Sequence, residues 1–135
     1  MKKILLSILS ISLILFCGFK RAEKPFAVVS SGKITQENLQ RYERFFNVGQ
    51  RINYALIAPD GVKYSGIRMQ LSKQDNKTTN WGLSIVESKS IFIPKGQNTY
   101  YIDYIVPRES GNYALQFFYA NKKNYPFARR EFVVQ

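Results

Sequence analysis

The side chains that could take part in acid–base or nucleophilic chemistry are few in this sequence. It has no histidine, and its single cysteine, Cys17, lies within an apolar N-terminal run. Histidine is the usual general base and metal ligand near neutral pH, so its absence excludes Ser-His-Asp and Cys-His arrangements and zinc sites built on imidazole. Paired carboxylates remain, as in glycoside hydrolysis. Most of the nine acidic residues lie beside turn or basic residues, which is typical of a solvated surface. We therefore expect no enzyme activity, no metal and no cofactor.

The N-terminal segment predicts export from the cytoplasm. Lys2 and Lys3 precede an apolar run of 16 residues, 4–19, and this combination is typical of a secretory signal. A membrane-spanning helix needs about 20 apolar residues, so the run is short for a permanent transmembrane segment. We expect residues 1–22 to be a signal and tether, and residues 23–135 to be one folded domain in the bacterial periplasm or on the cell surface.

Two processing sites are open within this segment. The stretch from Ile14 to Gly18 resembles the end of a bacterial lipoprotein signal, and the resemblance implies that Cys17 is acylated and attaches the protein to a membrane. In that family a small residue usually precedes the cysteine, whereas Phe16 stands there in this sequence. The alternative is cleavage near Ala22, with Cys17 as one more apolar residue of the signal. In either case the folded domain has no cysteines to pair and must be stable through its core alone.

The rest of the sequence predicts an all-β domain. From Gly49 onward, short segments with strand character are separated by turn signals at intervals of roughly 8–15 residues, which is typical of a sandwich or barrel. Ile52, Tyr54 and Leu56 share one face of the first long strand. A Pro59-Asp60-Gly61 turn ends this strand, because glycine adopts the positive φ that a tight turn needs. The pattern predicts a single antiparallel sandwich of about seven to eight strands.

Three further strands are predicted, and two of them have a specific predicted face. Residues 81–85 and 91–93 are expected to form two separate short strands, the first with Leu83 and Ile85 on one face. In the next strand the residues expected on the core face are Tyr100, Ile102, Tyr104 and Val106. Tyr101 and Asp103 should then point outward. An exposed Tyr101 could belong to an aromatic platform for a sugar, although outward tyrosines more often pack against their neighbours.

Residues 35–46 fit both a helix and a strand. Thr35 is a suitable N-cap, and Glu37 and Arg41 are spaced as an i, i+4 ion pair. Phe46 fits the helical spacing of the apolar residues that precede it in the segment. The same residues also place Phe46 and Val48 on one face of a strand. Short apolar patterns cannot decide between the two. We expect one short helix or turn here, before the first long strand.

Residues 109–115, with the sequence Glu-Ser-Gly-Asn-Tyr-Ala-Leu, resemble the tyrosine corner of immunoglobulin-like domains. There a tyrosine near the start of the penultimate long strand bonds through its hydroxyl to the backbone just upstream. The resemblance covers roughly residues 45–135 and implies an immunoglobulin-like sandwich of the kind found in bacterial envelope proteins. Gly111 and Tyr113 would form the corner and Trp81 would be a core tryptophan. Such a fold implies no particular activity.

The charge of the domain indicates its partners. Removing the signal leaves 16 basic and 9 acidic residues, a net charge of +7. Outside the cytoplasm such a domain meets anionic lipid headgroups, acidic polymers and acidic proteins rather than nucleic acid. Basic residues bracket the aromatic residues of the last hairpin, and we expect this cluster to bind a partner: Lys122, Lys123, Tyr125, Arg129 and Arg130. The alternative is a solvated hairpin whose charges discourage edge pairing.

Together these features predict a non-enzymatic, exported protein that serves in protein–protein interaction or assembly. Its expected partners are an envelope protein or an anionic envelope polymer, and the membrane itself if Cys17 is acylated. The second hypothesis, from a different class, is a carbohydrate- or cell-wall-binding module.

Overall fold

Eight strands build the described part of the domain, and no helix is present in it. The structure is a computed structural model that describes residues 24–37, 39, 43–74, 82–122 and 124–135. The predictions made for Cys17, Trp81 and Lys123 fall outside these residues. The strands are β1 (Phe26–Ser30), β2 (Phe45–Phe46), β3 (Ile52–Ala58), β4 (Gly66–Gln74), β5 (Leu83–Phe92), β6 (Thr99–Ile105), β7 (Gly111–Tyr119) and β8 (Ala128–Val134).

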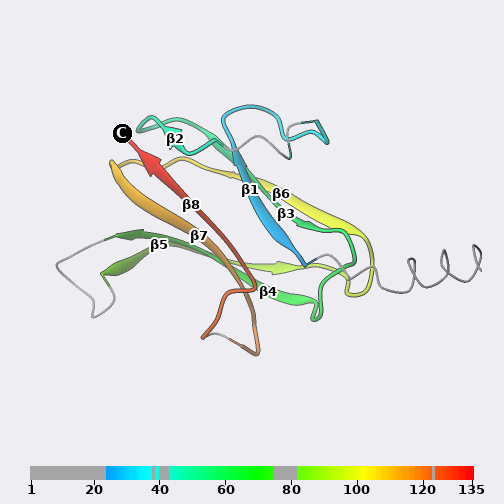
Figure 1. Cartoon of the computed structure of the whole chain (residues 1–135). Helices are drawn as coiled ribbons and strands as arrows, with labels where there is room; N and C mark the ends of the chain where they lie inside the picture. The colour runs from blue at the N-terminus through cyan, green and yellow to red at the C-terminus, as the bar shows by residue number, and fades with distance from the viewer. Residues whose placement is uncertain (1–23, 38, 40–42, 75–81, 123) are drawn as a thin grey trace, which may run out of the picture.

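The strands form two sheets that pack face to face (Figure 1). One sheet has the order β1-β3-β6 and the other has the order β2-β8-β7-β4-β5. Neighbouring strands are antiparallel, apart from the short β2, which runs parallel to β8. The prediction of an all-β sandwich is confirmed.

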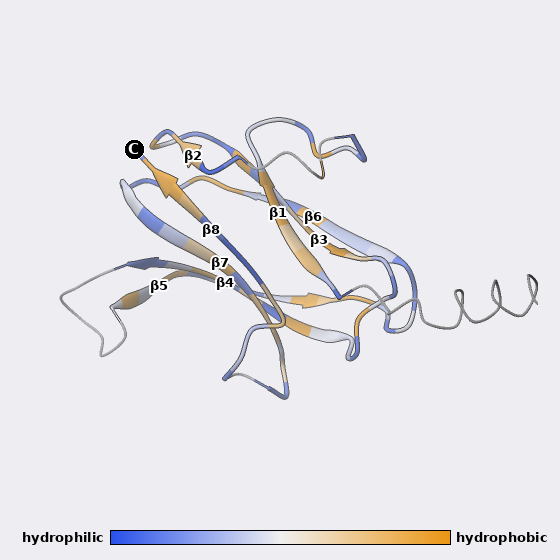
Figure 2. Cartoon of the chain, in the orientation of Figure 1, coloured by the Kyte–Doolittle hydropathy of each residue, from blue (hydrophilic) through white to orange (hydrophobic). Residues whose placement is uncertain are grey.

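The core lies between the two sheets because the inward residues of each strand are apolar. In β3, Ile52, Tyr54 and Leu56 are fully buried, as their alternation predicts. From the other sheet come the buried rings of Phe117 and Phe132, and the Phe117 ring lies 6.1 Å from that of Tyr54. Figure 2 shows hydrophobic residues concentrated in the strands. Burial contributes about 1.5–3 kcal/mol for each large apolar side chain, so this core is the source of stability in a domain that has no cysteine to pair.

The turn after β3 forms as predicted. Gly61 has a φ of +84°, and its N–H donates to the carbonyl oxygen of Ala58 at 3.1 Å. The loop between β5 and β6 approaches so closely that a Cβ at position 61 would lie 2.7 Å from the backbone nitrogen of Gln97. Both the backbone conformation and this close approach therefore require glycine.

The short helix or turn expected in residues 35–46 is a turn, and the described part of that segment contains no helix. Residues 36 and 37 form a turn, and Phe45 and Phe46 form β2; residues 38 and 40–42 lie outside the described part. The ring of Phe46 is buried at right angles to that of Phe132, with 5.6 Å between centroids. The N–H of Gln135 donates to the carbonyl oxygen of Phe46 at 2.8 Å. These tertiary contacts outweigh the local helical pattern.

Residues 83–92 form one continuous strand, β5, and the prediction of two short strands is wrong. β5 pairs with β4, with a β-bulge where Leu71 pairs with Glu87 and Ser72 pairs with Ile85. The extra residue of the bulge breaks the alternation of faces along β5. Ile85 therefore lies on the outside of the sheet and is 61% exposed. Pairing with β4 also carries the strand through the polar residues 87–90, which the sequence pattern alone does not favour as strand.

The two faces of β6 are the reverse of the prediction. Tyr100 is 68% exposed, whereas Tyr101 packs against the core. The register pairs Asp103 with Tyr54 and Tyr101 with Leu56, and because directly paired residues share a face, Tyr101 and Asp103 point inward. β6 is the edge strand of its sheet and has apolar residues on both faces. The hydrophobic alternation along β6 therefore does not show which face is buried. Because the side-chain period is two, choosing the wrong face reverses the orientation of every side chain.

The two ends of the sandwich carry different parts of the chain. The strand register places the start of β1 at the same end as the loops 59–65, 93–98 and 120–127. We call this the loop end. The opposite end carries loop 106–110 and Gln135 (Figure 1). The described chain thus begins with Lys24 at the loop end and finishes at the other end.

Candidate functional site

The two arginines of the predicted binding cluster lie on opposite faces of β8. Arg129 pairs with Gln116 on the outer face of the five-stranded sheet, and its guanidinium lies 2.7 Å from a carboxylate oxygen of Glu131. Arg130 pairs with Leu115 and is turned toward the interior, where it is only partly exposed. The structure therefore does not bring Arg129 and Arg130 together on one surface.

The other predicted residues lie at the loop end. Lys122 and Tyr125 are exposed in the loop between β7 and β8, where Tyr125 is 83% exposed. They line a groove of about 520 Å³ together with Lys63, Tyr119 and Phe127. The hairpin is thus a basic and aromatic surface of its own, separate from the arginines of β8.

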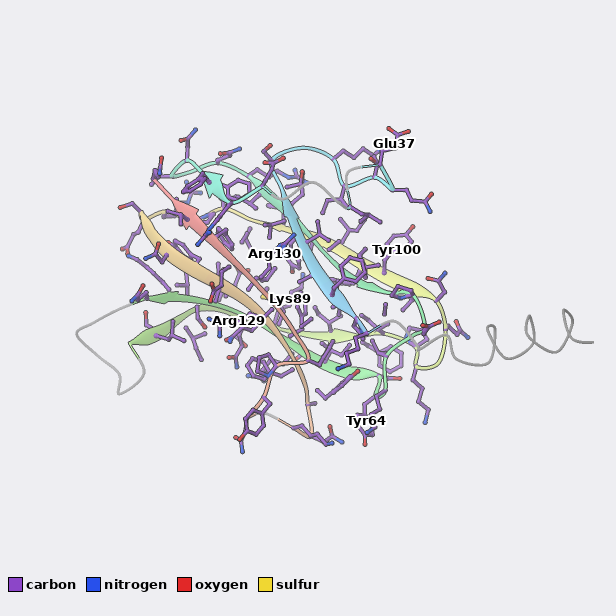
Figure 3. All side chains as sticks on the ribbon, viewed as in Figure 1. Glu37, Tyr64, Lys89, Tyr100, Arg129 and Arg130 are labelled. Atoms are coloured by element: carbon purple, nitrogen blue, oxygen red, sulfur yellow. The ribbon has the colours of Figure 1, made fainter. Side chains whose placement is uncertain are left out.

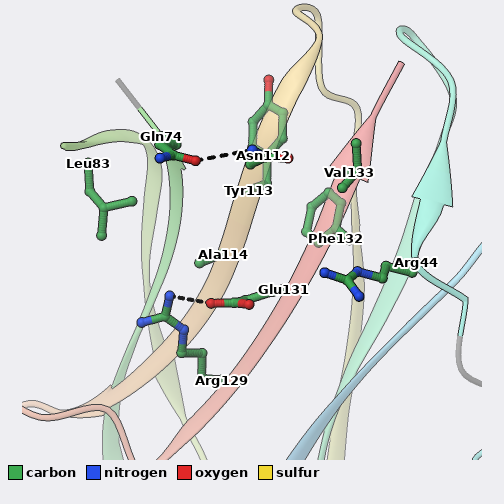
Figure 4. A pocket seen from close by; sticks show the side chains of 10 residues that line it. All are labelled: Arg44, Gln74, Leu83, Asn112, Tyr113, Ala114, Arg129, Glu131, Phe132 and Val133. Carbon is green, nitrogen blue, oxygen red and sulfur yellow. Dashed lines mark hydrogen bonds and ion pairs between the residues drawn. The ribbon is translucent and has the colours of Figure 1, made fainter. Parts of the chain in front are cut away.

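Arg129 contributes to a shallow polar groove on the outside of the five-stranded sheet (Figure 4). The groove has a volume of about 410 Å³ and also receives Arg44. Its polar groups largely satisfy one another, since Asn112 donates to Gln74 at 3.1 Å and Arg129 pairs with Glu131. Among the described residues that line it, Glu131 is the carboxylate.

Tyr113 fastens the connection between β6 and β7. Its hydroxyl donates to the carbonyl oxygen of Glu109 at 2.7 Å, and its ring stacks on that of Phe132 at 5.5 Å and 7°. At the start of the same strand Gly111 has a φ of +151°, and a Cβ there would meet the side chain of Lys73 at 2.7 Å. Lys73 in turn forms an ion pair of 2.6 Å with Glu109. Gly111 and Tyr113 thus have a structural role.

Three large hydrophobic side chains are exposed along β6. Tyr100, Ile102 and Tyr104 are 68%, 46% and 48% exposed, and they alternate along the outer side of this edge strand (Tyr100 is labelled in Figure 3). We call these three residues the β6 face. The guanidinium carbon of Arg51 lies 4.1 Å from the centre of the Tyr104 ring, which is a cation–π contact. The β6 face therefore combines large apolar area with hydroxyl groups and a positive charge.

An uncharged groove adjoins the β6 face. It has a volume of about 450 Å³ and lies between β6 and the segment that follows β1. Its apolar lining residues are Ile34, Leu39, Ile57, Tyr100 and Ile102. The other described residues that line it are uncharged. The groove extends the β6 face across the outside of the three-stranded sheet.

A polar bridge joins the two sheets where β5 and β6 form their edges. Lys89 of β5 makes an ion pair with Asp103 of β6, and the Tyr101 hydroxyl donates to Asp103 at 3.0 Å. Burial raises the pKa of Asp103, but hydrogen bonds from Lys89, from the Tyr104 N–H and from Tyr101 outweigh it and hold the pKa below its usual value. The hydrogen bond to Asp103 raises the pKa of Lys89. Both groups are therefore charged across the neutral range.

Neither protein-family models nor curated proteins give a relative from which a function could be carried over. No protein-family model matches the sequence, and no curated protein is significantly similar to it. Within the described ranges, no helix has the length and apolar character needed to cross a membrane. The same residues contain no group of three histidine, cysteine, aspartate or glutamate side chains placed to hold a metal ion. The function is therefore inferred from the exposed surfaces of the domain.

The β6 face is the feature that the sequence missed. The inward Tyr101 and Ile105 and the outward Tyr100, Ile102 and Tyr104 are equally apolar, so hydrophobic periodicity could not show which set is exposed. Asp103 on the inward side also misleads about which face of β6 is exposed, because an acid is expected on the solvent side unless it is paired. The ion pair with Lys89, which explains the inward Asp103, joins residues from two different sheets.

Proposed function

We propose that the protein is an exported, non-enzymatic binding module of the bacterial envelope, which captures another protein through the β6 face. The observation that carries the proposal is the exposure of Tyr100, Ile102 and Tyr104 along one side of an edge strand. The N-terminal signal-like segment supports export. Acylation of Cys17 would hold the module at a membrane.

The composition of the β6 face supports a protein partner. Tyrosine and arginine are enriched among the residues that dominate protein–protein binding, since they offer large contact area together with hydrogen bonds. Tyr104 and Arg51 already stack on each other, so part of the conformational cost of ordering them on binding is met in the free domain. The uncharged groove next to Tyr100 can receive an apolar side chain of the partner.

A carbohydrate- or cell-wall-binding module is the second candidate. Tyr100 and Tyr104 both face outward from one strand, and the flat apolar faces of exposed tyrosine rings can pack on sugar rings. Tyr101, which the sequence suggested for such a platform, is turned inward and takes no part. Sedimentation with isolated peptidoglycan that survives moderate salt and is lost in Tyr100→Ala would favour this candidate.

The test is photo-cross-linking in living cells. A photoreactive phenylalanine analogue replaces Ile102 in the centre of the β6 face, and a control chain carries it at Phe45, which is 63% exposed and lies on the other sheet. We expect one discrete adduct from position 102 that is absent from position 45, with mass spectrometry identifying the partner as an envelope protein. Adding Tyr104→Ser to the position-102 chain should remove the adduct.

Two results would contradict the proposal. Adducts of the same pattern from both positions would mean that the β6 face has no special affinity. An adduct that persists unchanged in chains with Tyr100→Ser and Tyr104→Ser would place the binding site elsewhere. In either case the exported domain would need another binding surface.

A further inference from the structure

Positive charge is concentrated at the loop end of the sandwich. By sequence, its three loops and the residue that enters β1 carry five lysines and one aspartate: Lys24, Lys63, Lys95, Lys122 and Lys123, with Asp60. The four of these lysines that lie in the described part are all exposed. The opposite end carries both signs, as Arg108 and Glu109 in one loop illustrate. The charge asymmetry therefore follows the long axis of the domain.

Aromatic side chains accompany these lysines. Tyr125 is 83% exposed in loop 120–127, and Phe92 is 77% exposed at the end of β5. Tyr119 stacks on Phe127 with 4.1 Å between ring centroids, and meets Tyr64 edge to face at 5.3 Å. Figure 3 shows Tyr64 at the lower margin of the domain, far from Glu37 at the upper margin. The loop end thus combines exposed lysines with an aromatic cluster.

Two adjacent grooves open between these groups. One has a volume of about 520 Å³ and is lined by Lys63, Lys122 and Tyr125, and the other has about 390 Å³ and is lined by Lys24 and Lys63. Both share Lys63 and Tyr119. The N–H of Lys63 donates to the Tyr119 hydroxyl at 3.0 Å, which fixes the loop between β3 and β4 against the aromatic cluster.

We infer that the loop end lies on an anionic lipid bilayer, with Lys24, Lys63 and Lys122 at the headgroup phosphates and with Tyr125 and Phe92 in the interface. Lysines near an anionic leaflet attract it electrostatically, and their aliphatic stems can lie along apolar surface while the ammonium groups stay in water. Aromatic rings are enriched at the boundary between headgroups and hydrocarbon. The inference rests on the proposed export and membrane attachment of the chain.

The path of the chain favours a bilayer over an acidic protein as the occupant. The described chain enters at Lys24 and Pro25, which line one of the two grooves, and Cys17 with the apolar run 4–19 precedes this point by only a few residues. A lipid attached at Cys17 would therefore lie close to the loop end. The β6 face runs along the side of the sandwich and would remain accessible to a protein partner.

The test measures lysine reactivity on vesicles. Full-length chain is reconstituted into phosphatidylcholine vesicles and into vesicles that also contain phosphatidylglycerol, and brief acetylation is followed by mass spectrometry. Lys33, which is exposed and follows the other end of β1, is the reference. We expect phosphatidylglycerol to slow acetylation of Lys63 and Lys122 by about fivefold relative to Lys33, and high salt to reverse the effect. Equal rates on both vesicles would overturn the inference.

Charge variants provide a matched control. In Lys63→Gln with Lys122→Gln, the protection of Lys24 and Lys95 on phosphatidylglycerol vesicles should fall. In Arg44→Gln with Arg108→Gln, which removes the same charge from the opposite end and keeps Lys33 as the reference, Lys24 and Lys95 should stay protected. Equal loss in both double variants would mean that net charge rather than the loop end is responsible, and would overturn the inference.

The outcomes separate this inference from the proposed function. Adducts from position 102 with unprotected Lys63 and Lys122 would reject the bilayer contact and leave the protein-binding function in place. Protected lysines without adducts from position 102 would reject protein binding by the β6 face and leave the bilayer contact in place. Protection by soluble polyglutamate but not by phosphatidylglycerol vesicles would assign the loop end to an acidic protein and overturn the bilayer contact.

Discussion

The hydroxyl of Tyr113 donates a hydrogen bond of 2.7 Å to the carbonyl oxygen of Glu109, four residues upstream. The bond connects the start of β7 to the loop that follows β6, at the point where the chain crosses between the sheets. The Tyr113 ring is at the same time stacked on Phe132. A single side chain thus connects the loop, β7 and β8.

Replacing Tyr113 by phenylalanine should test this connection. The ring can keep its stacking on Phe132, so the change removes only the hydroxyl and leaves the Glu109 carbonyl to find another donor. We expect the free energy of unfolding to fall by about 1 kcal/mol, measured by urea denaturation. Tyr119→Phe is a comparison, because its hydroxyl accepts from an exposed loop and should matter less. An unchanged stability in Tyr113→Phe would show that water replaces the hydroxyl without cost.

The Lys89–Asp103 pair predicts a dependence of stability on acid pH. The pKa of Asp103 is lowered in the folded state, so its stabilising effect is present above the unfolded pKa of about 3.9 and is lost as the pH falls through the folded pKa. Because Lys89 is 44% exposed, the pair should contribute only about 1 kcal/mol.

Thermal unfolding of the wild type and of Asp103→Asn across the pH range measures this contribution. The difference in Tm between the two proteins should be largest near neutral pH and should shrink below about pH 4. A difference that stays constant down to strongly acid pH would show that the carboxylate charge plays no part.

Gly61 and Gly96 form a matched pair for backbone strain. Both have a positive φ, of 84° and 76°. A Cβ at position 61 would lie 2.7 Å from the nitrogen of Gln97, whereas a Cβ at position 96 meets nothing within 4 Å. Gly96→Ala should cost about 1 kcal/mol from strain alone, and Gly61→Ala about 2–3 kcal/mol because the neighbouring loop must also move. Equal losses in denaturation experiments would contradict the close approach.

Replacing the neighbouring tyrosines of β6 by serine should change the free energy of unfolding by very different amounts. Tyr101→Ser removes a ring that packs on the core and a hydrogen bond to Asp103, so we expect a loss of about 2–3 kcal/mol. Tyr100→Ser removes an exposed ring and should change stability by less than about 0.5 kcal/mol. Calorimetry of the two variants decides which face of β6 is outside. The same result shows whether a binding defect in Tyr100→Ser arises from the surface or from unfolding.

The sequence predicted those parts of the structure that depend on local signals. The alternation of Ile52, Tyr54 and Leu56 identified the core face of β3, and Pro59-Asp60-Gly61 identified the turn that follows it. The hydrogen bond of Tyr113 also lies where the pattern placed it. In each case the residues that form the feature are close together in the chain.

Features that depend on distant partners could not be predicted. The bulge that turns Ile85 outward arises from pairing with β4, and Phe46 joins a strand because Phe132 and Gln135 are its neighbours in space. The placement of Arg129 and Arg130 on opposite faces could have been predicted, since consecutive residues in a regular strand point to opposite faces. That placement followed already from the predicted strand.

The positions of Lys24 and Gln135 at opposite ends of the sandwich determine how the domain would respond to a mechanical pull. A force applied between these two residues runs parallel to the strands. The ladder bonds of antiparallel strands are perpendicular to this direction, so those between β1 and β3 would be loaded together in shear rather than opened one after another. The fold is therefore arranged to transmit tension along its length without unravelling from either end.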